Sequence, residues 1–226
     1  MRTLTGSLCV ALWLAGPSAA ADLDGLMRDL KSKDSDVRRT AAIELGKLGA
    51  EAKPAVEALV KALKDDDVFV RRFSAQALGE IGPDASGSVS ALSSALHDKD
   101  KRVVEAAAQA LGKMGSGGVK GLTAVVKDSN RPAEVRRVAI ESLGKIGPDA
   151  KSAVPALIDV LKARGPRRPM PTDMEQVVRL EAVQTLGKIG PDAQEAVKTL
   201  EELDAARNRD RTFKAAVKEA LRKIKK

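Results

Sequence analysis

The chain has 226 residues, of which 31% are charged and only 2% aromatic, and its formal net charge is +8. This length permits one or two domains. The single cysteine, Cys9, and the single tryptophan, Trp13, both lie close to the N-terminus. The composition therefore excludes a disulfide-stabilised fold, and packing alone must stabilise the structure.

The first residues are typical of a secretory signal peptide. A basic start precedes an apolar run over residues 8–15, Gly16 and Pro17 break that run, and small residues follow at 18–21. This pattern predicts a cleaved signal peptide over residues 1–21, so that the mature protein, residues 22–226, is periplasmic or secreted. The alternative is an uncleaved membrane anchor, although the apolar run is short for a spanning helix.

Five copies of one phrase recur along the rest of the chain. Each begins Leu-Gly and has a second Gly three residues after the first, and the first Gly falls at positions 46, 79, 112, 144 and 187. The spacings are therefore 33, 33, 32 and 43 residues. A sixth, divergent copy has Leu221 and Arg222 in place of the Leu-Gly pair. A fixed period of this length predicts a solenoid of repeated supersecondary units.

Each unit is predicted to contain two helices. Apolar or small residues recur at three- and four-residue spacing before each Leu-Gly pair, as in residues 70–78. The second Gly suits a left-handed helix end, and a Pro follows it in three units. A second helix follows in segments such as residues 154–161, and Asp34, Asp67 and Asp100 stand where they can cap the next helix. No segment alternates as a strand does, so an all-α fold is predicted.

These phrases resemble the HEAT-repeat family, in particular the short HEAT-like repeats of the phycobilisome-lyase type. The matching pattern is an Asp turn, Val-Arg, small residues and then Ala-Leu-Gly-x-Ile-Gly-Pro, and it covers the chain from about residue 24 onward. The resemblance implies an all-α, right-handed α-solenoid of about five to six two-helix repeats. It also implies that the Val-Arg helices line the concave face. Such repeats serve scaffolds, adaptors, lyases and hydroxylases, so the resemblance is specific for fold and not for function.

Two adjacent columns of basic residues follow the Val of each unit. Resemblance to HEAT proteins implies that the first column is a structural ladder in which each Arg binds turn Asp residues; its members are Arg38, Arg71, Arg136 and Arg179. The second column is freer to point outward and is a candidate partner-binding stripe; its members are Arg39, Arg72 and Arg137. Unit three interrupts the two columns with Val104 and Glu105.

The 43-residue spacing indicates an insertion at about residues 163–175. This segment contains Arg164, Arg167 and Arg168 together with three Pro residues, which favour an extended loop. Insertions in solenoids map to loops that often bind partners, so these arginines are further partner-binding candidates. The alternative is a surface loop without a function.

The positive charge is concentrated at the C-terminus. Residues 205–226 hold nine basic residues against Asp210 and Glu219, a balance of +7, so residues 22–204 are neutral overall. This basic capping helix could contact an anionic membrane or polysaccharide surface; the candidate residues are Arg222, Lys223, Lys225 and Lys226. The alternative is a polar cap that keeps the end of the solenoid soluble.

No catalytic, cofactor-binding or metal-binding constellation stands out. His97 is the only imidazole, and such sites usually recruit several groups. Nucleic acid is disfavoured as a partner, because residues 22–204 are neutral overall and contain no Trp or Tyr that could stack on bases. The sequence therefore predicts an exported, non-catalytic interaction or scaffold protein that binds a protein partner through its concave face and Arg/Pro-rich loop. The alternatives are a lyase-like, cofactor-handling HEAT protein and a protein anchored to the cell envelope by its basic helix.

Overall fold

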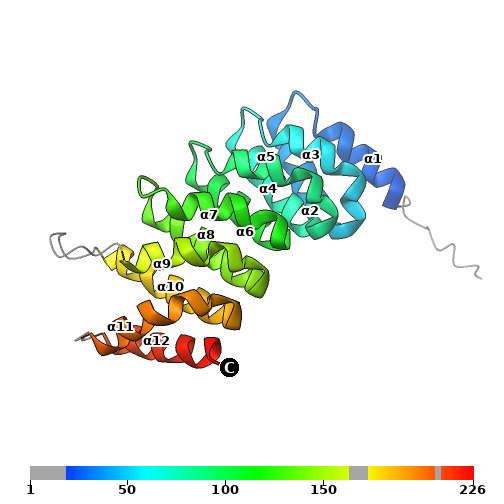
Figure 1. Ribbon diagram of the computed structural model, residues 1–226. Coiled ribbons are helices and arrows are strands. Elements are labelled where there is room, and N and C mark those ends of the chain that lie inside the picture. Colours follow the sequence, from blue (N-terminus) through cyan, green and yellow to red (C-terminus); the bar gives the residue numbers. More distant parts are fainter. Residues whose placement is uncertain (1–18, 163–172, 207–209) are drawn as a thin grey trace, which may run out of the picture.

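The computed structural model describes residues 19–162, 173–206 and 210–226 (Figure 1). The predicted signal peptide, residues 1–21, lies almost wholly outside these residues, and so does most of the inserted loop at about residues 163–175. Within them the chain forms twelve α-helices and five short 3-10 segments, and no strand. The predicted all-α repeat architecture is confirmed. In this described part, no helix combines the length and apolar character needed to cross a bilayer.

The helices alternate between two layers (Figure 1). One layer holds α2 (Ser35–Lys47), α4 (Val68–Ile81), α6 (Lys101–Lys113), α8 (Ala133–Ile146), α10 (Asp173–Ile189) and α12 (Arg211–Ile224). The other holds α1 (Ala19–Asp29), α3 (Val56–Ala62), α5 (Val89–Ala95), α7 (Val119–Lys127), α9 (Val154–Lys162) and α11 (Val197–Ala205). The 3-10 segments lead from the first layer into the second; they are η1 (Gly49–Ala55), η2 (Gly82–Ser88), η3 (Gly115–Gly118), η4 (Gly147–Ala153) and η5 (Gly190–Ala196).

The even-numbered helices form the spine of the solenoid, because each packs on the next along the chain. Figure 1 shows them on the inner side of the curve, with the odd-numbered helices covering the outer side. Each odd-numbered helix packs on the even-numbered helix that follows it. Six helix pairs result, in agreement with the predicted five to six repeats.

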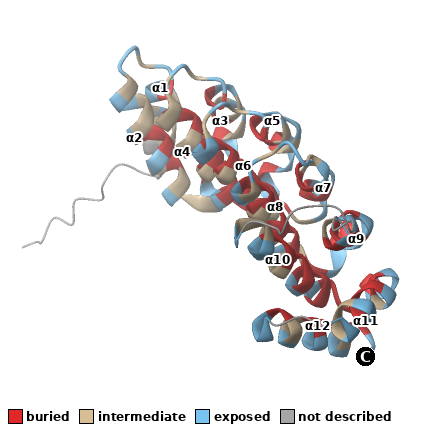
Figure 2. Ribbon diagram, turned by 90° about the vertical axis from the view of Figure 1, so that its left-hand side faces the viewer, coloured by how far each residue is buried: buried red, intermediate tan, exposed pale blue. Residues whose placement is uncertain are grey.

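The core lies between the two layers, where Figure 2 shows a continuous row of buried residues. The Leu of each repeated phrase is fully buried; these residues are Leu45, Leu78, Leu111, Leu143 and Leu186. Many of the remaining buried residues are alanines, which allow neighbouring helices to approach closely. Burial of a Leu side chain contributes roughly 1.5–3 kcal/mol, so this row accounts for much of the stability of each unit.

Each repeated phrase uses its two glycines for different purposes. The second Gly ends a helix with positive φ, as at Gly82, where φ is 72°. The first Gly lies inside an even-numbered helix against the backbone of the next one. A Cβ added to Gly79 would lie 2.9 Å from the Cα of Ala110. The sequence predicts the role of the second Gly, whereas the close approach of α4 and α6 at the first Gly is visible only in the fold.

We expect Gly79→Ala to lower the free energy of unfolding by about 1–3 kcal/mol, because the added methyl group forces α4 and α6 apart. Gly87→Ala is the matched control, since Gly87 belongs to the same unit and a Cβ added there would meet no atom within 4 Å. It should leave stability unchanged or raise it slightly. Chemical denaturation of both variants checks this, and equal stabilities would contradict the close approach of the two helices.

Asp residues in the turns cap α2, α4 and α6, as predicted. Asp34 accepts a hydrogen bond from the amide of Asp36, Asp67 from those of Phe69 and Val70, and Asp100 from that of Arg102. Each carboxylate satisfies an amide that has no partner within its own helix, which typically stabilises a helix by about 1 kcal/mol. The caps of α2 and α4 fix the starting points of the two helices that carry the first two arginines of each column.

Candidate functional site

Two arginines of the first column bridge successive turns. Arg38 donates from Nε and Nη2 to the carboxylate of Asp65, each at 2.8 Å. Arg71 donates in the same way to Asp98, at 2.7 and 3.0 Å. The side chains of Arg71 and Asp98 are only 7% and 11% exposed. Burial raises the pKa of Asp98, but hydrogen bonds from Arg71 and a backbone amide outweigh it, and the pKa lies below its ordinary value.

The other two members of this column have different partners. Arg136 forms an ion pair with Glu175. Arg179 donates to the backbone oxygen of Leu161 at 3.3 Å, and its guanidinium lies 5.4 Å from the ring centroid of Phe213. All four arginines therefore contact neighbouring elements of the solenoid.

The column is interrupted at Val104, and Arg131 supplies a bridge there. Arg131 precedes α8, and its Nη1 donates to the backbone oxygen of Leu96 at 2.5 Å. Its Nε donates to Asp128 at 3.2 Å. Arg131 was not predicted from the sequence because it belongs to neither column. The sequence feature that could have indicated this bridge is an additional Arg in the turn after the unit that contains Val104.

Two members of the second column are already ion-paired. Arg39 contacts Asp36 and Asp67, one on its own helix and one in the next turn. Arg137 pairs with Glu141, four residues further along α8, at 3.1 Å. Hydrogen bonding by Arg39 holds the pKa of Asp67 well below its ordinary value. A partner's carboxylate would therefore have to compete with existing acceptors at Arg39 and Arg137.

Arg72 differs from these two. Within the described ranges it forms no hydrogen bond or ion pair, and its guanidinium lies 5.6 Å from the ring centroid of Phe73. A guanidinium held over a ring face keeps its N–H donors available at the ring's edge. The loop candidates Arg164, Arg167 and Arg168 lie outside the described residues.

The turn carboxylates make stability depend on pH. The hydrogen bond from Arg102 lowers the pKa of Asp100 to about 2, from an ordinary value of 3.8. A carboxyl group whose pKa is lower in the folded state stabilises the fold above its unfolded pKa and loses that effect as the pH falls. We therefore expect the thermal midpoint to fall between about pH 4 and pH 2, with a shallower fall in Asp100→Asn. A constant midpoint in thermal scans across this range would contradict the assignment.

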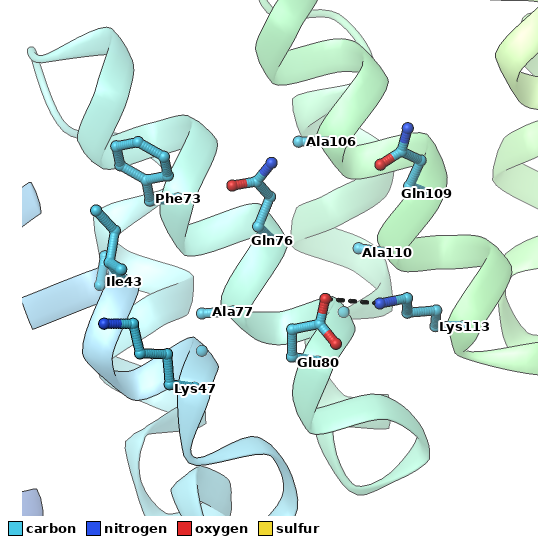
Figure 3. A pocket seen from close by; sticks show the side chains of 13 residues that line it. Ile43, Lys47, Phe73, Gln76, Ala77, Glu80, Ala106, Gln109, Ala110 and Lys113 are labelled. Atoms are coloured by element: carbon cyan, nitrogen blue, oxygen red, sulfur yellow. Dashed lines mark hydrogen bonds and ion pairs between the residues drawn. The ribbon is translucent and has the colours of Figure 1, made fainter.

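A groove of about 580 Å³ crosses α2, α4 and α6 on the concave side (Figure 3). It is lined by Ala42, Ile43, Gly46, Lys47, Phe73, Gln76, Ala77, Gly79, Glu80, Ala106, Gln109, Ala110 and Lys113. Its volume falls within the range of known ligand sites. Because it runs across three repeats and is open to solvent, its shape suits an elongated ligand.

The groove has two chemically different edges (Figure 3). Ile43 and Phe73 form the apolar edge, and Ile43 is 36% exposed, so its side chain can contact an occupant of the groove. Lys47, Glu80 and Lys113 form the charged edge, where Lys113 and Glu80 are 2.8 Å apart. An occupant would meet apolar surface on one side and charges of both signs on the other.

Two amide side chains lie between these edges. Gln76 and Gln109 occupy equivalent positions in α4 and α6, one repeat apart, and Figure 3 shows both at the groove. Neither amide forms a hydrogen bond with another described residue. Each retains a carbonyl acceptor and two N–H donors, the complement of a peptide group.

An aromatic and arginine cluster continues the apolar edge. The rings of Phe69 and Phe73 are 6.3 Å apart and stacked. The guanidinium groups of Arg39 and Arg102 lie 5.0 and 5.2 Å from the ring centroid of Phe69. This cluster was not predicted from the sequence. The feature that could have indicated it is the spacing of Phe69 and Phe73, two of the chain's three Phe residues, which stand four positions apart on one helix.

The cations predicted to contact an anionic surface are mostly ion-paired. Arg222 and Lys223 contact Glu219, and Lys225 contacts Glu201. The hydrogen bond from Arg222 lowers the pKa of Glu219 to about 2. Lys226 is exposed at the C-terminus. Among the described residues there is no group of three or more His, Cys, Asp or Glu side chains that could hold a metal ion.

Comparison with known proteins identifies the repeats. The family model described as HEAT repeats matches residues 8–75, 23–112 and 56–132, and that of the PBS lyase HEAT-like repeat matches residues 135–163. No curated protein matches the chain in sequence.

Solved structures share the architecture. An engineered protein is 28% identical with a TM-score of 0.63, over 90% of this chain and 96% of that chain. A second engineered protein is 26% identical with a TM-score of 0.63, over 92% of this chain and 59% of that one. A computationally designed armadillo repeat protein for modular peptide recognition is 18% identical with a TM-score of 0.56, over 88% and 98% of the two chains. The matches to the HEAT-repeat model together cover more than half of the present chain, and the chain therefore belongs to the HEAT-repeat family.

Proposed function

We propose that this chain is an exported, non-catalytic scaffold that binds an extended segment of a protein partner in the groove across α2, α4 and α6. The observation that carries the proposal is the pairing, in one open groove, of an apolar edge with two amides that have no described partner. Apolar side chains of the segment would pack against Ile43 and Phe73. Its peptide groups would exchange hydrogen bonds with Gln76 and Gln109.

Arg72 adds a charged contact at the apolar edge. Its position over Phe73 favours a partner segment that carries an Asp or Glu beside an apolar residue. Aromatic and arginine side chains are common in the regions of interfaces that contribute most to affinity. The armadillo repeat protein designed for modular peptide recognition has a related fold, and a protein partner for the present chain is consistent with that likeness.

A site-specific crosslinking experiment tests this function. A photoreactive residue at Gln109, which lines the groove, should capture a partner protein in the organism's exported fraction. The same residue at Lys120, exposed on the outer helix α7, is the control and should capture nothing in common. The Gln109 adduct should disappear when Phe73 is also changed to Ala. Equal capture from the two positions, or capture unaffected by Phe73→Ala, would contradict the proposal.

The inserted loop contributes a second contact in this proposal. In the proposal Arg164, Arg167 and Arg168 attract the partner through their positive charge, so replacing all three with Ala should weaken its recovery in a pull-down by several-fold. The effect should diminish at high salt, because exposed charge pairs are screened. Unchanged recovery would restrict the binding surface to the concave groove.

A further inference from the structure

The last helix, α12, has two different faces. Five cations follow one another at intervals of three and four residues and therefore lie on one side of the helix; they are Arg211, Lys214, Lys218, Arg222 and Lys225. The opposite side is buried in the solenoid through Phe213, Val217, Ala220 and Ile224. Figure 1 shows α12 at the end of the solenoid farthest from α1. We refer to the five cations as the cationic stripe.

The stripe occupies the surface on which another repeat would pack. The positions equivalent to Lys218 in the preceding helices are buried and apolar; they are Ala42, Ala75, Ala108, Ile140 and Val183. Arg222 and Lys225 stand where those helices have the first and second Gly of the repeated phrase. Any polar side chain would stop further stacking and keep this end soluble. A polar cap could equally well consist of acidic or uncharged side chains. Capping therefore does not explain why the charges of the stripe are all positive.

Ion pairs neutralise only part of the stripe. Arg222 pairs with Glu219 and Lys225 with Glu201, each at 2.7 Å. Arg211, Lys214 and Lys218 form no ion pair with any residue that the structure describes. Arg211 and Lys218 are exposed and Lys214 is half-buried. Three cations along one helix face are therefore available to an external anion.

We infer that the cationic stripe docks on an anionic phospholipid bilayer. The stripe is about 20 Å long, because a helix rises about 1.5 Å per residue, and lipids can diffuse to place an anionic headgroup under each cation. Each basic residue near such a surface raises partitioning by about fivefold. Three unpaired cations should therefore give a preference on the order of 100-fold for anionic over neutral lipid.

Other macromolecules fit this face less well. A protein interface usually has apolar or aromatic anchors, and α12 exposes no large apolar side chain. A nucleic-acid duplex carries its charges at fixed positions on two strands, whereas lipid headgroups can diffuse to match the spacing of the stripe. The apolar face of α12 is already used in the solenoid, so the contact with lipid is electrostatic and does not involve insertion.

Vesicle sedimentation with the full chain tests the inference. Vesicles of phosphatidylcholine with about 30% phosphatidylserine should bind the protein on the order of 100-fold more strongly than phosphatidylcholine alone, at low salt. This comparison cancels any affinity of the apolar N-terminal run for lipid itself. The difference should largely vanish at about 0.5 M salt, because screening weakens exposed charges.

Charge-reversal variants locate the contact. Lys214→Glu with Lys218→Glu should abolish the preference for anionic vesicles. Lys120→Glu with Lys127→Glu makes the same charge change on exposed positions of α7 and should retain most of it. Equal loss in the two double variants, salt-insensitive binding, or tighter binding to a short DNA duplex than to the anionic vesicles would each overturn the inference. Circular dichroism establishes that both variants keep their helices.

Discussion

Replacing Arg71 with Ala is expected to lower the free energy of unfolding by about 3–5 kcal/mol. Arg71 holds the carboxylate of Asp98 in a nearly buried pair and also donates to the backbone oxygens of Asp65 and Asp66. Removing the guanidinium leaves a poorly solvated carboxylate without its counter-ion, and that cost exceeds the value of the intact pair. The loss falls on the contact between the second and third repeats, so denaturation should become less cooperative.

Arg102→Ala is the matched control for this prediction. Arg102 also binds an Asp of the same turn, but its side chain is 44% exposed. Exposed pairs contribute at most about 1 kcal/mol, so the loss of stability should be small. Urea denaturation of the two variants makes the comparison. A difference between them of less than about 1 kcal/mol would contradict a structural role for the buried ladder.

Phe73→Ala is expected to weaken binding of the crosslinked partner by about 30-fold, which corresponds to about 2 kcal/mol. The substitution removes the aromatic part of the apolar edge, and with it the ring over which Arg72 is held. Arg72→Gln, which keeps the ring, should cost less, because it removes a single charge-assisted contact.

Titration calorimetry with purified partner measures these affinities. Lys120→Ala is the control for binding, since Lys120 is exposed on the outer layer and should have no effect. Thermal unfolding of each variant separates lost affinity from lost stability. Partner affinity within about twofold of the unchanged protein in Phe73→Ala would exclude the apolar edge from the binding surface.

The periodic features of the fold could be predicted from the sequence. Contacts that recur with the repeat follow from the alignment, and the pairs Arg38–Asp65 and Arg71–Asp98 share a separation of 27 residues. The second Gly of each phrase was also predictable, because positive φ is a local property that favours Gly. Family resemblance added the assignment of the inner and outer layers.

Features that depart from the repeat could not be predicted in the same way. Arg131 replaces the bridge missing at Val104 from a different turn, so no column contains it. The pairing of Arg39 with Asp67 depends on how far α4 is displaced from α2, which the spacing alone does not specify. The groove itself depends on the spacing of three separate helices, α2, α4 and α6, and on the small residues that line it, such as Ala77 and Ala110.

The most direct test of partner binding in the groove is methyl NMR of the isotope-labelled protein during titration with the crosslinked partner. The Ile43 methyl groups lie in the groove, whereas Ile224 is buried in α12 at the end of the solenoid. We predict that Ile43 shifts or broadens as partner is added and that Ile224 stays unchanged. An unperturbed Ile43 with saturating partner would contradict binding across α2, α4 and α6.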